Sequence, residues 1–508
     1  MRIAFLISLT VFFLSCSSEN INRQYGEGSS TTQCDEKCLE RKSELSTQLY
    51  FAEEIYSYFD EKKTETGTNY SQLNRTLSSE ITSSTTDTEY YRILGRWAAA
   101  FKDGHVSVNW RGNRIRVYNL PVRFELLGAG TTAEVMVVNG SDDSRVTIGD
   151  EVISIDGMPA AEAITNALGR VTGSTERMRR FSAARKLAEV QQVPEDGTIM
   201  LRLRKGTGVE QDVELPLNGV ILPEKPDKEP ARSADNYVKV KILSANIGYL
   251  KIDTFSADDL DRALKEGFDY IAGTKGLIID VRSNGGGAPN SASLVMSRLT
   301  SQKIVKYKNK LRISSAVLTE RTEYGLKYHL DNLPLEQKFS DYIDEEVKPA
   351  GTRYANPVVV LTSPRCFSAC DTFVSGMKLN NLATIVGEAT GGGTGTPLSI
   401  DLDSGNSIRY SVLNGRTILD TPIEGHGTDP DIYIAPTATS RQQGLDIQLE
   451  EAGRVLAVQI ARKTGKAPLR QDYAREGVIP GEEYWRQDVG TLPSEEELFE
   501  WSTEYLEE

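Results

Sequence analysis

Apolar residues recur at helical spacing in two stretches near the start of the chain. Between residues 42 and 59, and again between residues 90 and 101, steps of three and four residues place apolar side chains on one face. This pattern predicts a helical domain over residues 34–117, in which the helices end before His105 and a strand begins at Val106. The stripe residues are Leu45, Leu49, Ile55, Tyr56, Phe59, Ile93, Leu94, Trp97 and Phe101.

Short β-type runs dominate the next hundred residues. One run, Gly149-Asp150-Glu151-Val152-Ile153 followed by Asp156-Gly157, resembles the corresponding part of a PDZ domain. We therefore expect a PDZ-like domain over residues 119–222, which either binds a peptide or serves only as a spacer. The expected strands are 122–124, 133–138, 151–155 and 200–203, and the expected helix is 160–168.

Strands and helices alternate in the second half of the chain. A charged, proline-rich linker over residues 223–236 precedes them, and a C-terminal extension over residues 456–508 follows them. Alternation of this kind predicts an α/β core over residues 237–455 with parallel strand pairing, within a multi-domain α/β protein. The expected strands are 248–252, 276–281, 357–361 and 384–387, and the expected helices are 257–271, 288–299 and 368–379.

Charge and the N-terminal segment restrict partners and location. The net charge of −14 leaves no basic stripe for phosphate contacts, which argues against nucleic acid as a partner. Arg2 precedes an apolar run over residues 3–14 that is too short to span a bilayer. With Ser15-Cys16 it resembles a bacterial lipoprotein signal. We expect a signal peptide over residues 1–16, lipid attachment at Cys16, a tether over residues 17–33 and a lipid-anchored protein of the bacterial cell envelope, periplasmic or surface-exposed; a plain cleaved signal is the alternative.

Four further cysteines form two pairs with a spacing of four residues, Cys34 with Cys38 and Cys366 with Cys370. Residues at this spacing on a helix lie about 6 Å apart, which a disulfide can bridge. Zinc ligation is the rival interpretation, but no histidine stands near either pair. An exported protein with an even number of cysteines favours local disulfides, while the connectivity stays open.

Two strand ends carry residues suited to nucleophilic catalysis. The apolar run 359–361 ends in a turn, and Ser368-Ala369 opens a helix, so a serine hydroxyl lies at a strand-to-helix corner. A second strand ends in three glycines. We expect Ser368 to be a nucleophile and the oxyanion hole to combine the N–H of Ala369 with that of Gly286 or Gly287.

Five segments, in their order along the chain, resemble the carboxyl-terminal processing (tail-specific) protease family. They are 248–252 (GYLKI), 280–287 (DVRSNGGG), 367–369 (FSA), 385–393 (IVGEATGGG) and 427–431 (GTDPD). The resemblance implies a ClpP/crotonase-like catalytic core and a serine endopeptidase that cuts peptides or proteins through an acyl-enzyme, without metal or other cofactor.

The general base is the point at which the chain departs from the best-known members. Where Ser/Lys members of the family carry a lysine, this chain has Gly393. Asp103-Gly104-His105 instead resembles the tricorn-like branch, in which a histidine from an N-terminal segment is the base and a glutamate orients it. The resemblance implies Ser368, His105 and Glu424 as the triad, with a pH profile that rises near the ordinary imidazole pKa of about 6.5.

Alternatives to this triad remain. Lys378 is the candidate for a lysine base from elsewhere, and a chain that has lost the lysine is also compatible with a non-catalytic peptide-binding lipoprotein. His426 lies in a loop near the site, whereas His329 stands in a polar stretch. For Asp371 and Glu388 we expect structural roles.

Overall fold

The computed structural model describes residues 34–109, 115–190, 194–222, 233–320, 327–328 and 337–465. The predicted signal peptide with Cys16, the tether, most of the linker and the chain beyond residue 465 lie outside the described residues. Among the helices that are described, none combines the length and the apolar character that a membrane span requires.

The N-terminal region is helical, as its apolar stripes predicted. Its helices are α1 (Glu36–Ile55), α2 (Phe59–Thr66), α3 (Tyr70–Glu80) and α4 (Asp87–Ala99). A capping box, in which Thr86 and Glu89 bond each other's backbone, begins α4. The apolar faces of these helices pack around Trp97 and Phe101, and both side chains are completely buried.

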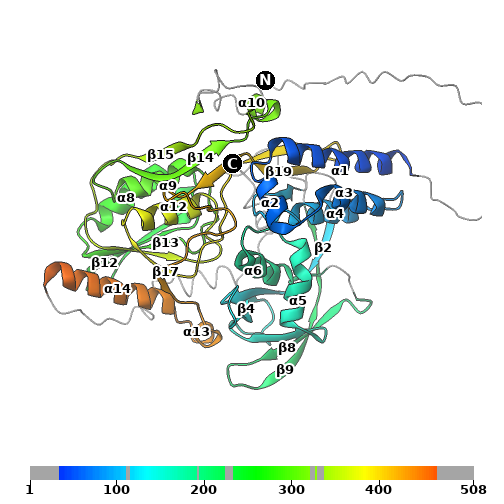
Figure 1. Cartoon of the computed structure of the whole chain (residues 1–508). Coiled ribbons are helices and arrows are strands. Elements are labelled where there is room, and N and C mark those ends of the chain that lie inside the picture. Colours follow the sequence, from blue (N-terminus) through cyan, green and yellow to red (C-terminus); the bar gives the residue numbers. More distant parts are fainter. Residues whose placement is uncertain are drawn as a thin grey trace, which may run out of the picture.

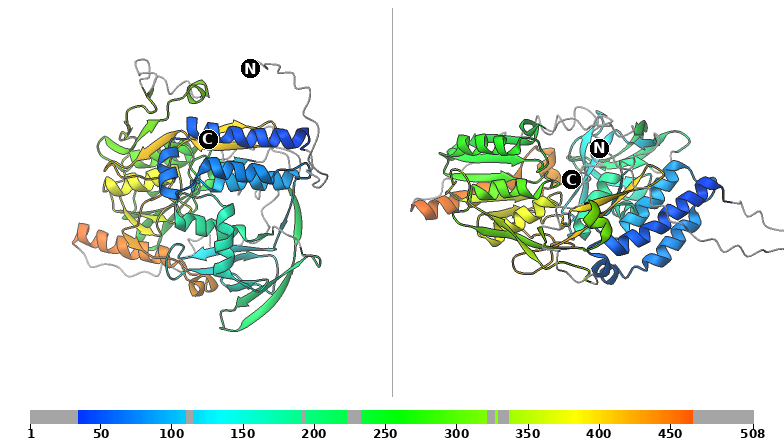
Figure 2. Two further views of the ribbon diagram at one scale, coloured as in Figure 1. Left: turned by 45° about the vertical axis from the view of Figure 1, so that its right-hand side comes forward. Right: turned by 90° about the horizontal axis from the view of Figure 1, so that it is seen from above.

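The N-terminal helices share their core with a hairpin from the second half of the chain. Strand β1 (Ser107–Asn109) pairs with β19 (Ser407–Ser411), which pairs in turn with β18 (Pro397–Asp401). Tyr410 of β19 lies in the same buried cluster as Trp97, whose indole N–H donates to the Tyr410 hydroxyl at 2.8 Å. The helices therefore lie beside the α/β core and join it through this hairpin (Figures 1 and 2).

The next region is a β-rich unit with its own core. An antiparallel sheet runs in the order β3-β4-β5-β8-β9, and Phe124, Leu201 and Leu203 are buried in its core beside the flanking helices. A smaller sheet, β10-β2-β7, adjoins it. The elements are β2 (Ile115–Asn119), β3 (Val122–Leu127), β4 (Val135–Ser141), β5 (Glu151–Ile155), β6 (Met158–Pro159), α5 (Ala160–Ala167), α6 (Glu176–Lys186), β7 (Glu189–Val190), β8 (Thr198–Arg204), β9 (Glu210–Pro216) and β10 (Asn218–Leu222).

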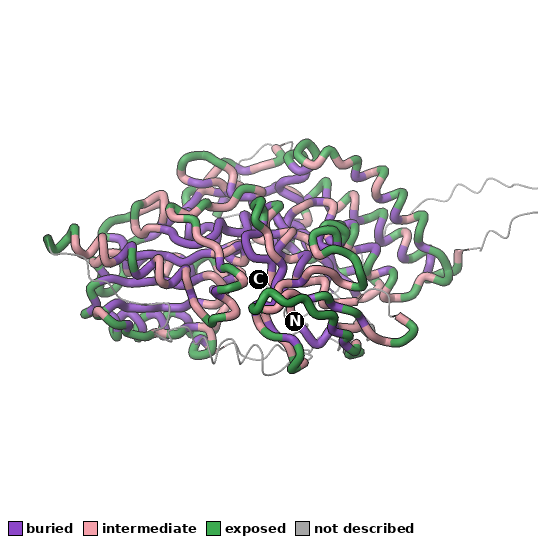
Figure 3. Tube along the Cα trace, turned by 90° about the horizontal axis from the view of Figure 1, so that it is seen from below, coloured by how far each residue is buried: buried purple, intermediate pink, exposed green. Residues whose placement is uncertain are grey.

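The second half of the chain has the predicted α/β fold. A six-stranded sheet runs β11-β12-β13-β16-β17-β21, parallel except for the antiparallel edge strand β11. Strands β13 and β16 are buried along their whole length. Buried segments run through the interior of the molecule, with exposed ones around them (Figure 3). The elements are α7 (Ala234–Tyr237), β11 (Val238–Leu243), β12 (Ile247–Ile252), α8 (Leu260–Ile271), β13 (Gly276–Asp280), α9 (Pro289–Ser297), β16 (Val358–Thr362), α12 (Ala369–Leu379), β17 (Thr384–Gly387) and β21 (Ile432–Tyr433).

Helices cover both faces of this sheet. One face packs on α8, α9 and α12, and the other packs on the last described helix, α14 (Ile447–Thr464). Helix α14 runs through residue 455, where we expected the core to end, because Leu449, Ala452 and Leu456 are all needed to bury this face. The remaining elements are β14 (Ile304–Leu311), α10 (Ser315–Glu320), β15 (Ile343–Val347), β20 (Leu413–Arg416) and α13 (Ala438–Gln442).

Candidate active site

Ser368 occupies a strained corner between β16 and α12. Its backbone has φ 58° and ψ −120°, a conformation that residues other than glycine rarely adopt. The corner projects the hydroxyl toward the N-terminal region, where Ser368 Oγ lies 3.0 Å from Nε2 of His105. The fold thus joins two residues that are 263 positions apart. A serine hydroxyl within hydrogen-bond distance of an imidazole is the arrangement that activates a serine nucleophile.

His105 is held by a hydrogen bond from its backbone N–H and by contact of its side chain with one aromatic ring. Its N–H donates to Asp103 Oδ1 at 2.7 Å, and its imidazole packs against the ring of Phe367 with centroids 4.6 Å apart. Gly104 allows this approach, because a Cβ there would lie 2.5 Å from the Phe367 ring. Burial, with a contribution from the Arg409 guanidinium, lowers the pKa of His105 to about 3. The imidazole is therefore neutral at physiological pH, and the expected titration near 6.5 is replaced by one at lower pH.

Glu424 lies beside His105 but does not hydrogen-bond to it. Carboxylate oxygens of Asp103 and Glu424 and a ring nitrogen of His105 all lie within 4.8 Å of one another. Among the described residues, however, Nδ1 of His105 has no hydrogen-bond partner, and Asp103 Oδ1 lies 3.9 Å from it. The Glu424 carboxylate instead contacts the Lys62 ammonium at 3.2 Å and accepts from the Thr394 N–H at 3.3 Å. The structure thus places Glu424, which the family resemblance implies as the orienting residue, beside His105 without a hydrogen bond between the two side chains.

Lys62 is a site residue that the sequence did not reveal, and Asp103 was recognised only as part of the Asp103-Gly104-His105 motif, without a role of its own. Lys62 comes from α2, and its buried ammonium donates to the Lys102 carbonyl at 3.1 Å as well as facing Glu424. Burial lowers the Lys62 pKa, but Glu424 and Asp103 outweigh it, so the net shift is upward. Burial raises the pKa of Asp103, which also accepts from the Tyr56 hydroxyl at 2.7 Å. No local pattern marks Lys62, because its partner lies in the last part of the chain.

Judged by the distances between its possible ligand atoms, the same cluster is the part of the site that could hold a metal ion. Asp103, His105 and Glu424 offer three ligand atoms within one coordination sphere. The Lys62 ammonium already neutralises Glu424 at that point. A surface group of Glu40, Glu44 and Asp403 has similar spacing but lies far from the serine corner, on α1 and the β18–β19 turn.

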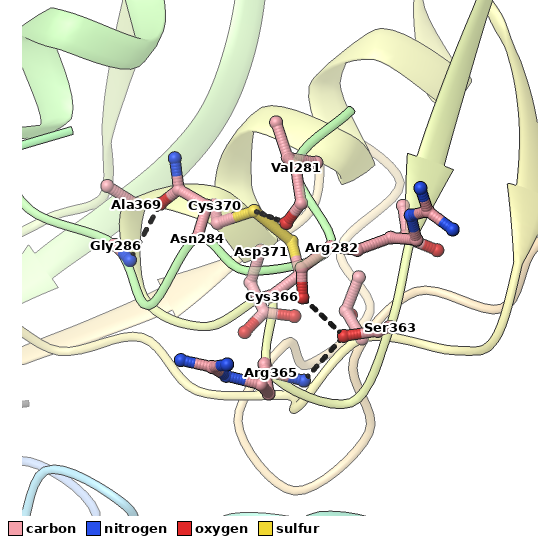
Figure 4. Close-up of a disulfide and its surroundings, with 12 residues drawn as sticks. Val281, Arg282, Asn284, Gly286, Ser363, Arg365, Cys366, Ala369, Cys370 and Asp371 are labelled. Carbon is pink, nitrogen blue, oxygen red and sulfur yellow. Dashed lines mark hydrogen bonds between the residues drawn. A yellow bond between two sulfur atoms is a disulfide. The ribbon is translucent and has the colours of Figure 1, made fainter. Parts of the chain in front are cut away.

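Two backbone amides face the serine corner. Among the described residues, neither the N–H of Ala369 nor that of Gly287 has a protein acceptor. The N–H of Gly286, by contrast, donates to Asn284 Oδ1 at 2.8 Å (Figure 4), so its assignment to the oxyanion hole is wrong. Gly286 serves by being small, since a Cβ there would lie 2.7 Å from Ser368 Cβ. Ala369 and Gly287 therefore stay the two candidate donors for an oxyanion hole, since no acceptor in the described part of the chain occupies their N–H groups.

Phe367 fills the space beside Gly393, the position at which the family resemblance places the lysine of Ser/Lys members. A Cβ on Gly393 would lie 1.9 Å from the Phe367 ring, so no lysine fits at this position. Asp371 fixes the loop, as expected, by accepting from the N–H groups of Gly392 at 3.1 Å and Gly393 at 2.9 Å. Burial raises the pKa of Asp371 to about 7 against these hydrogen bonds.

Neither of the other two candidate bases that the structure describes reaches Ser368. Lys378 lies ten residues further along α12, about 15 Å away, where it donates to the Asp429 carbonyl at 2.7 Å and pairs with Asp431. The ring of His426 contacts the carbonyl of Glu424 through Nδ1 at 3.0 Å. His329 lies outside the described residues.

Both cysteine pairs are disulfides. Cys34 bonds to Cys38 at the start of α1, and Cys366 bonds to Cys370 across the serine corner. The second bridge lies next to Val281 at the end of β13 (Figure 4). The local pairing favoured by the spacing is therefore the one observed, and these thiols are not zinc ligands.

The β-rich unit also touches the site. At the start of α6, the Thr175 hydroxyl donates to the Gly391 carbonyl at 3.0 Å, and Arg177 Nε donates to the Thr390 carbonyl at 3.2 Å. Just before them, Ser174 Oγ accepts from the Gly104 N–H at 3.1 Å. Glu388 also lies where the β-rich unit meets the α/β core, and burial there raises the pKa of its carboxyl to about 7. The unit thus supports both the glycine loop and the histidine segment.

Comparison with known proteins identifies the catalytic region. Residues 246–434 match the model of Peptidase family S41. Over 224 residues the chain is 26% identical to the carboxy-terminal-processing protease of Bartonella bacilliformis, a match that covers 42% of this chain and 46% of that protein. A chloroplastic C-terminal processing peptidase of Tetradesmus obliquus is 24% identical over 218 residues, which cover 41% of this chain and 38% of that protein. The chain therefore spans less than half the length of these curated relatives.

A solved structure shows the same fold over most of the molecule. Mature CPAF superposes with a TM-score of 0.69 at 18% sequence identity, and the match covers 84% of this chain and 99% of that one. The resemblance to the carboxyl-terminal processing protease family is confirmed, and the matches support a serine peptidase.

Proposed function

We propose that this serine peptidase is an endopeptidase of the bacterial cell envelope, with Ser368 as nucleophile and His105 as base. The observation that carries the proposal is the 3.0 Å contact between Ser368 Oγ and Nε2 of a buried, neutral imidazole. A neutral imidazole can accept the hydroxyl proton as the oxygen attacks. The strained corner and the two free amides beside it are further support.

The residues divide the reaction between them. Ser368 Oγ attacks the peptide carbonyl while His105 Nε2 takes its proton, and the developing oxyanion accepts from the N–H groups of Ala369 and Gly287. The same nitrogen then protonates the leaving amine, and an acyl-enzyme forms on Ser368. Water, deprotonated by His105, releases the acyl product.

Positive charge on the imidazolium needs a carboxylate near Nδ1. Asp103 Oδ1, at 3.9 Å from Nδ1, provides negative charge behind the ring without a direct hydrogen bond, while Glu424 in the same cluster is paired with Lys62. We infer that Asp103 stabilises the imidazolium electrostatically and that the Glu424–Lys62 pair positions the cluster around it. Glu424→Gln should therefore lower kcat less than His105→Ala does.

Active-site labelling tests the proposal directly. A fluorophosphonate should react with the full-length protein at Ser368, and Ser368→Ala should abolish labelling. His105→Ala should reduce kcat on a test peptide by about 10³-fold or more. A protein that binds the peptide but is not labelled at any residue would instead support the alternative, a non-catalytic peptide-binding lipoprotein.

The second part of the proposal is that the protein recognises its substrate by the free C-terminus of the substrate peptide. The family resemblance, the names of the relatives and the contact of the β-rich unit with the glycine loop support a PDZ-like role for residues 119–222. A peptide with a free C-terminal carboxylate should be cleaved faster than its amide. Equal rates for the acid and the amide would make this unit a spacer only.

Membrane attachment is the third part. The apolar run that ends at Ser15-Cys16 supports a lipid anchor at Cys16. Mass spectrometry of the mature N-terminus should find a diacylglyceryl cysteine there. A mature chain that starts at another residue would overturn the anchor while leaving the peptidase proposal intact.

A further inference from the structure

The Cys366–Cys370 disulfide encloses the nucleophile. Ser368 is the middle residue of the short segment that the two sulfur atoms close, and the Cα atoms of the cysteines lie 5.2 Å apart. Both cysteines are completely buried beside the end of β13 (Figure 4). The covalent link thus lies within the turn that presents the reactive hydroxyl, whereas the Cys34–Cys38 bridge lies at the start of α1.

The enclosed turn is in a backbone conformation that a free chain would leave. With φ 58°, Ser368 occupies a region that side chains with a Cβ avoid. This conformation sets the direction of Oγ toward His105 and of the Ala369 N–H toward the oxyanion position. A relaxation of Ser368 to negative φ would move both groups together.

The two cysteines also carry the anchors of the glycine loop. The Cys366 carbonyl accepts from the Gly391 N–H at 2.8 Å. Asp371, the residue after Cys370, accepts from the N–H groups of Gly392 and Gly393. Because the disulfide fixes Cys366 against Cys370, it fixes the spacing of these two anchors as well.

We propose that the Cys366–Cys370 disulfide positions the nucleophile, so that the peptidase reaches full activity only in its oxidised form. This inference rests on the proposed function of Ser368. Opening the bridge requires a dithiol reductant, which becomes a disulfide while the two cysteine sulfurs gain two electrons and two protons and become thiols. The freed turn relaxes, and Ser368 Oγ leaves its contact with His105.

A pair of matched double variants tests the inference. Cys366→Ala/Cys370→Ala removes the bridge around Ser368, and Cys34→Ala/Cys38→Ala removes a bridge of the same spacing away from the site. The first should lower kcat and the rate of fluorophosphonate labelling of Ser368 by about 10²-fold, since displacement by about 1 Å has that effect. KM should change by less than about threefold. The second variant should retain the wild-type kcat and labelling rate.

The split between kcat and KM separates positioning from simple stability. A purely structural bridge would lower the melting temperature and leave the labelling rate of the folded protein unchanged. Wild-type labelling in the Cys366→Ala/Cys370→Ala protein would therefore overturn the inference. A wild-type protein that is not labelled at all would overturn the proposed function, and the inference with it.

Reduction of the full-length wild-type protein provides a second test that needs no substitution. Dithiothreitol should lower the rate at which Ser368 is labelled by about 10²-fold at a temperature where the protein stays folded, and reoxidation should restore it. Alkylation and mass spectrometry show which bridge has opened. A protein that is reduced at Cys366 and Cys370, folded and fully active would overturn the inference even if the double variant fails to fold.

Discussion

Replacing Gly393 by alanine tests whether Phe367 holds His105, the proposed base, in place. The new Cβ would lie 1.9 Å from the ring, whereas ordinary contact begins at 3.4 Å, so the ring would have to move by about 1.5 Å. Phe367 is 1% exposed and packs on His105, so the ring cannot move without displacing the imidazole. Overpacking of this kind lowers the free energy of unfolding by about 1–3 kcal/mol. Displacement of the base by about 1 Å should lower kcat by about 10²-fold.

The assay combines thermal melting with kcat on a fluorogenic peptide. In a Phe367→Ala background the Gly393→Ala change should cost less, because the ring is gone, and the coupling energy of the cycle should be about 1–3 kcal/mol. Gly95→Ala is the matched control, since no atom lies within 4 Å of a Cβ there and alanine favours the interior of α4 by about 0.5–1 kcal/mol.

Gly393→Lys extends the same test to the choice of base. If the reasoning is right, this lysine displaces Phe367 and does not restore activity to a His105→Ala enzyme. Gly393→Ala with the melting temperature and kcat of the wild type would refute the argument, as would a Gly393→Lys rescue of His105→Ala.

Three further predictions concern charge and pH. Lys62→Met should lower the free energy of unfolding by about 3–5 kcal/mol, since it leaves the buried Glu424 carboxylate unpaired; a melting temperature equal to that of the wild type would contradict the pairing. Because only protonation of His105 removes the base, and its pKa is lowered to about 3, kcat/KM should hold its plateau down to about pH 5, and an acid limb at pH 6.5 or above would contradict this. Burial raises the pKa of Asp371 from 3.8 to about 7. The protonated carboxyl therefore stabilises the fold fully below pH 3.8, and this contribution is lost as the pH rises through 7, so the melting temperature should fall over that range. Asp371→Asn should make this fall smaller, and a variant with the pH dependence of the wild type would refute the reasoning.

The local sequence pattern was enough to predict elements whose ends are marked by glycine or by turn-forming residues. Strands β5 and β17 have the predicted limits, because β-branched runs end there at a turn or a glycine. Helix α3 was not predicted, since only Tyr70, Asn74 and Leu77 are buried on it and its other positions are polar. Apolar periodicity cannot reveal a helix that buries so little.

The sequence was enough to predict those parts of the site in which a recognisable motif lies at a predicted turn of the backbone. The corner at Ser368 is an example, whereas the partnership with His105 was implied by the family resemblance. The choice between Gly286 and Gly287 depended on the Asn284 side chain, which occupies one of the two amides. The partner of Glu424 depended on Lys62, which reaches it through tertiary packing and leaves no local signal.

The distance along the chain between His105 and Ser368 has a consequence for biosynthesis. The ribosome adds about 5–20 residues per second, so the chain needs roughly 13–53 s to grow from His105 to Ser368, which is 263 positions further along. Until then, and until the β18–β19 hairpin has docked on the N-terminal helices, no nascent chain contains a competent site. The part of the chain from 246 to 434 likewise lacks its base when made alone. Latency during synthesis is thus a property of the topology, which protects the producing cell from a partly made peptidase.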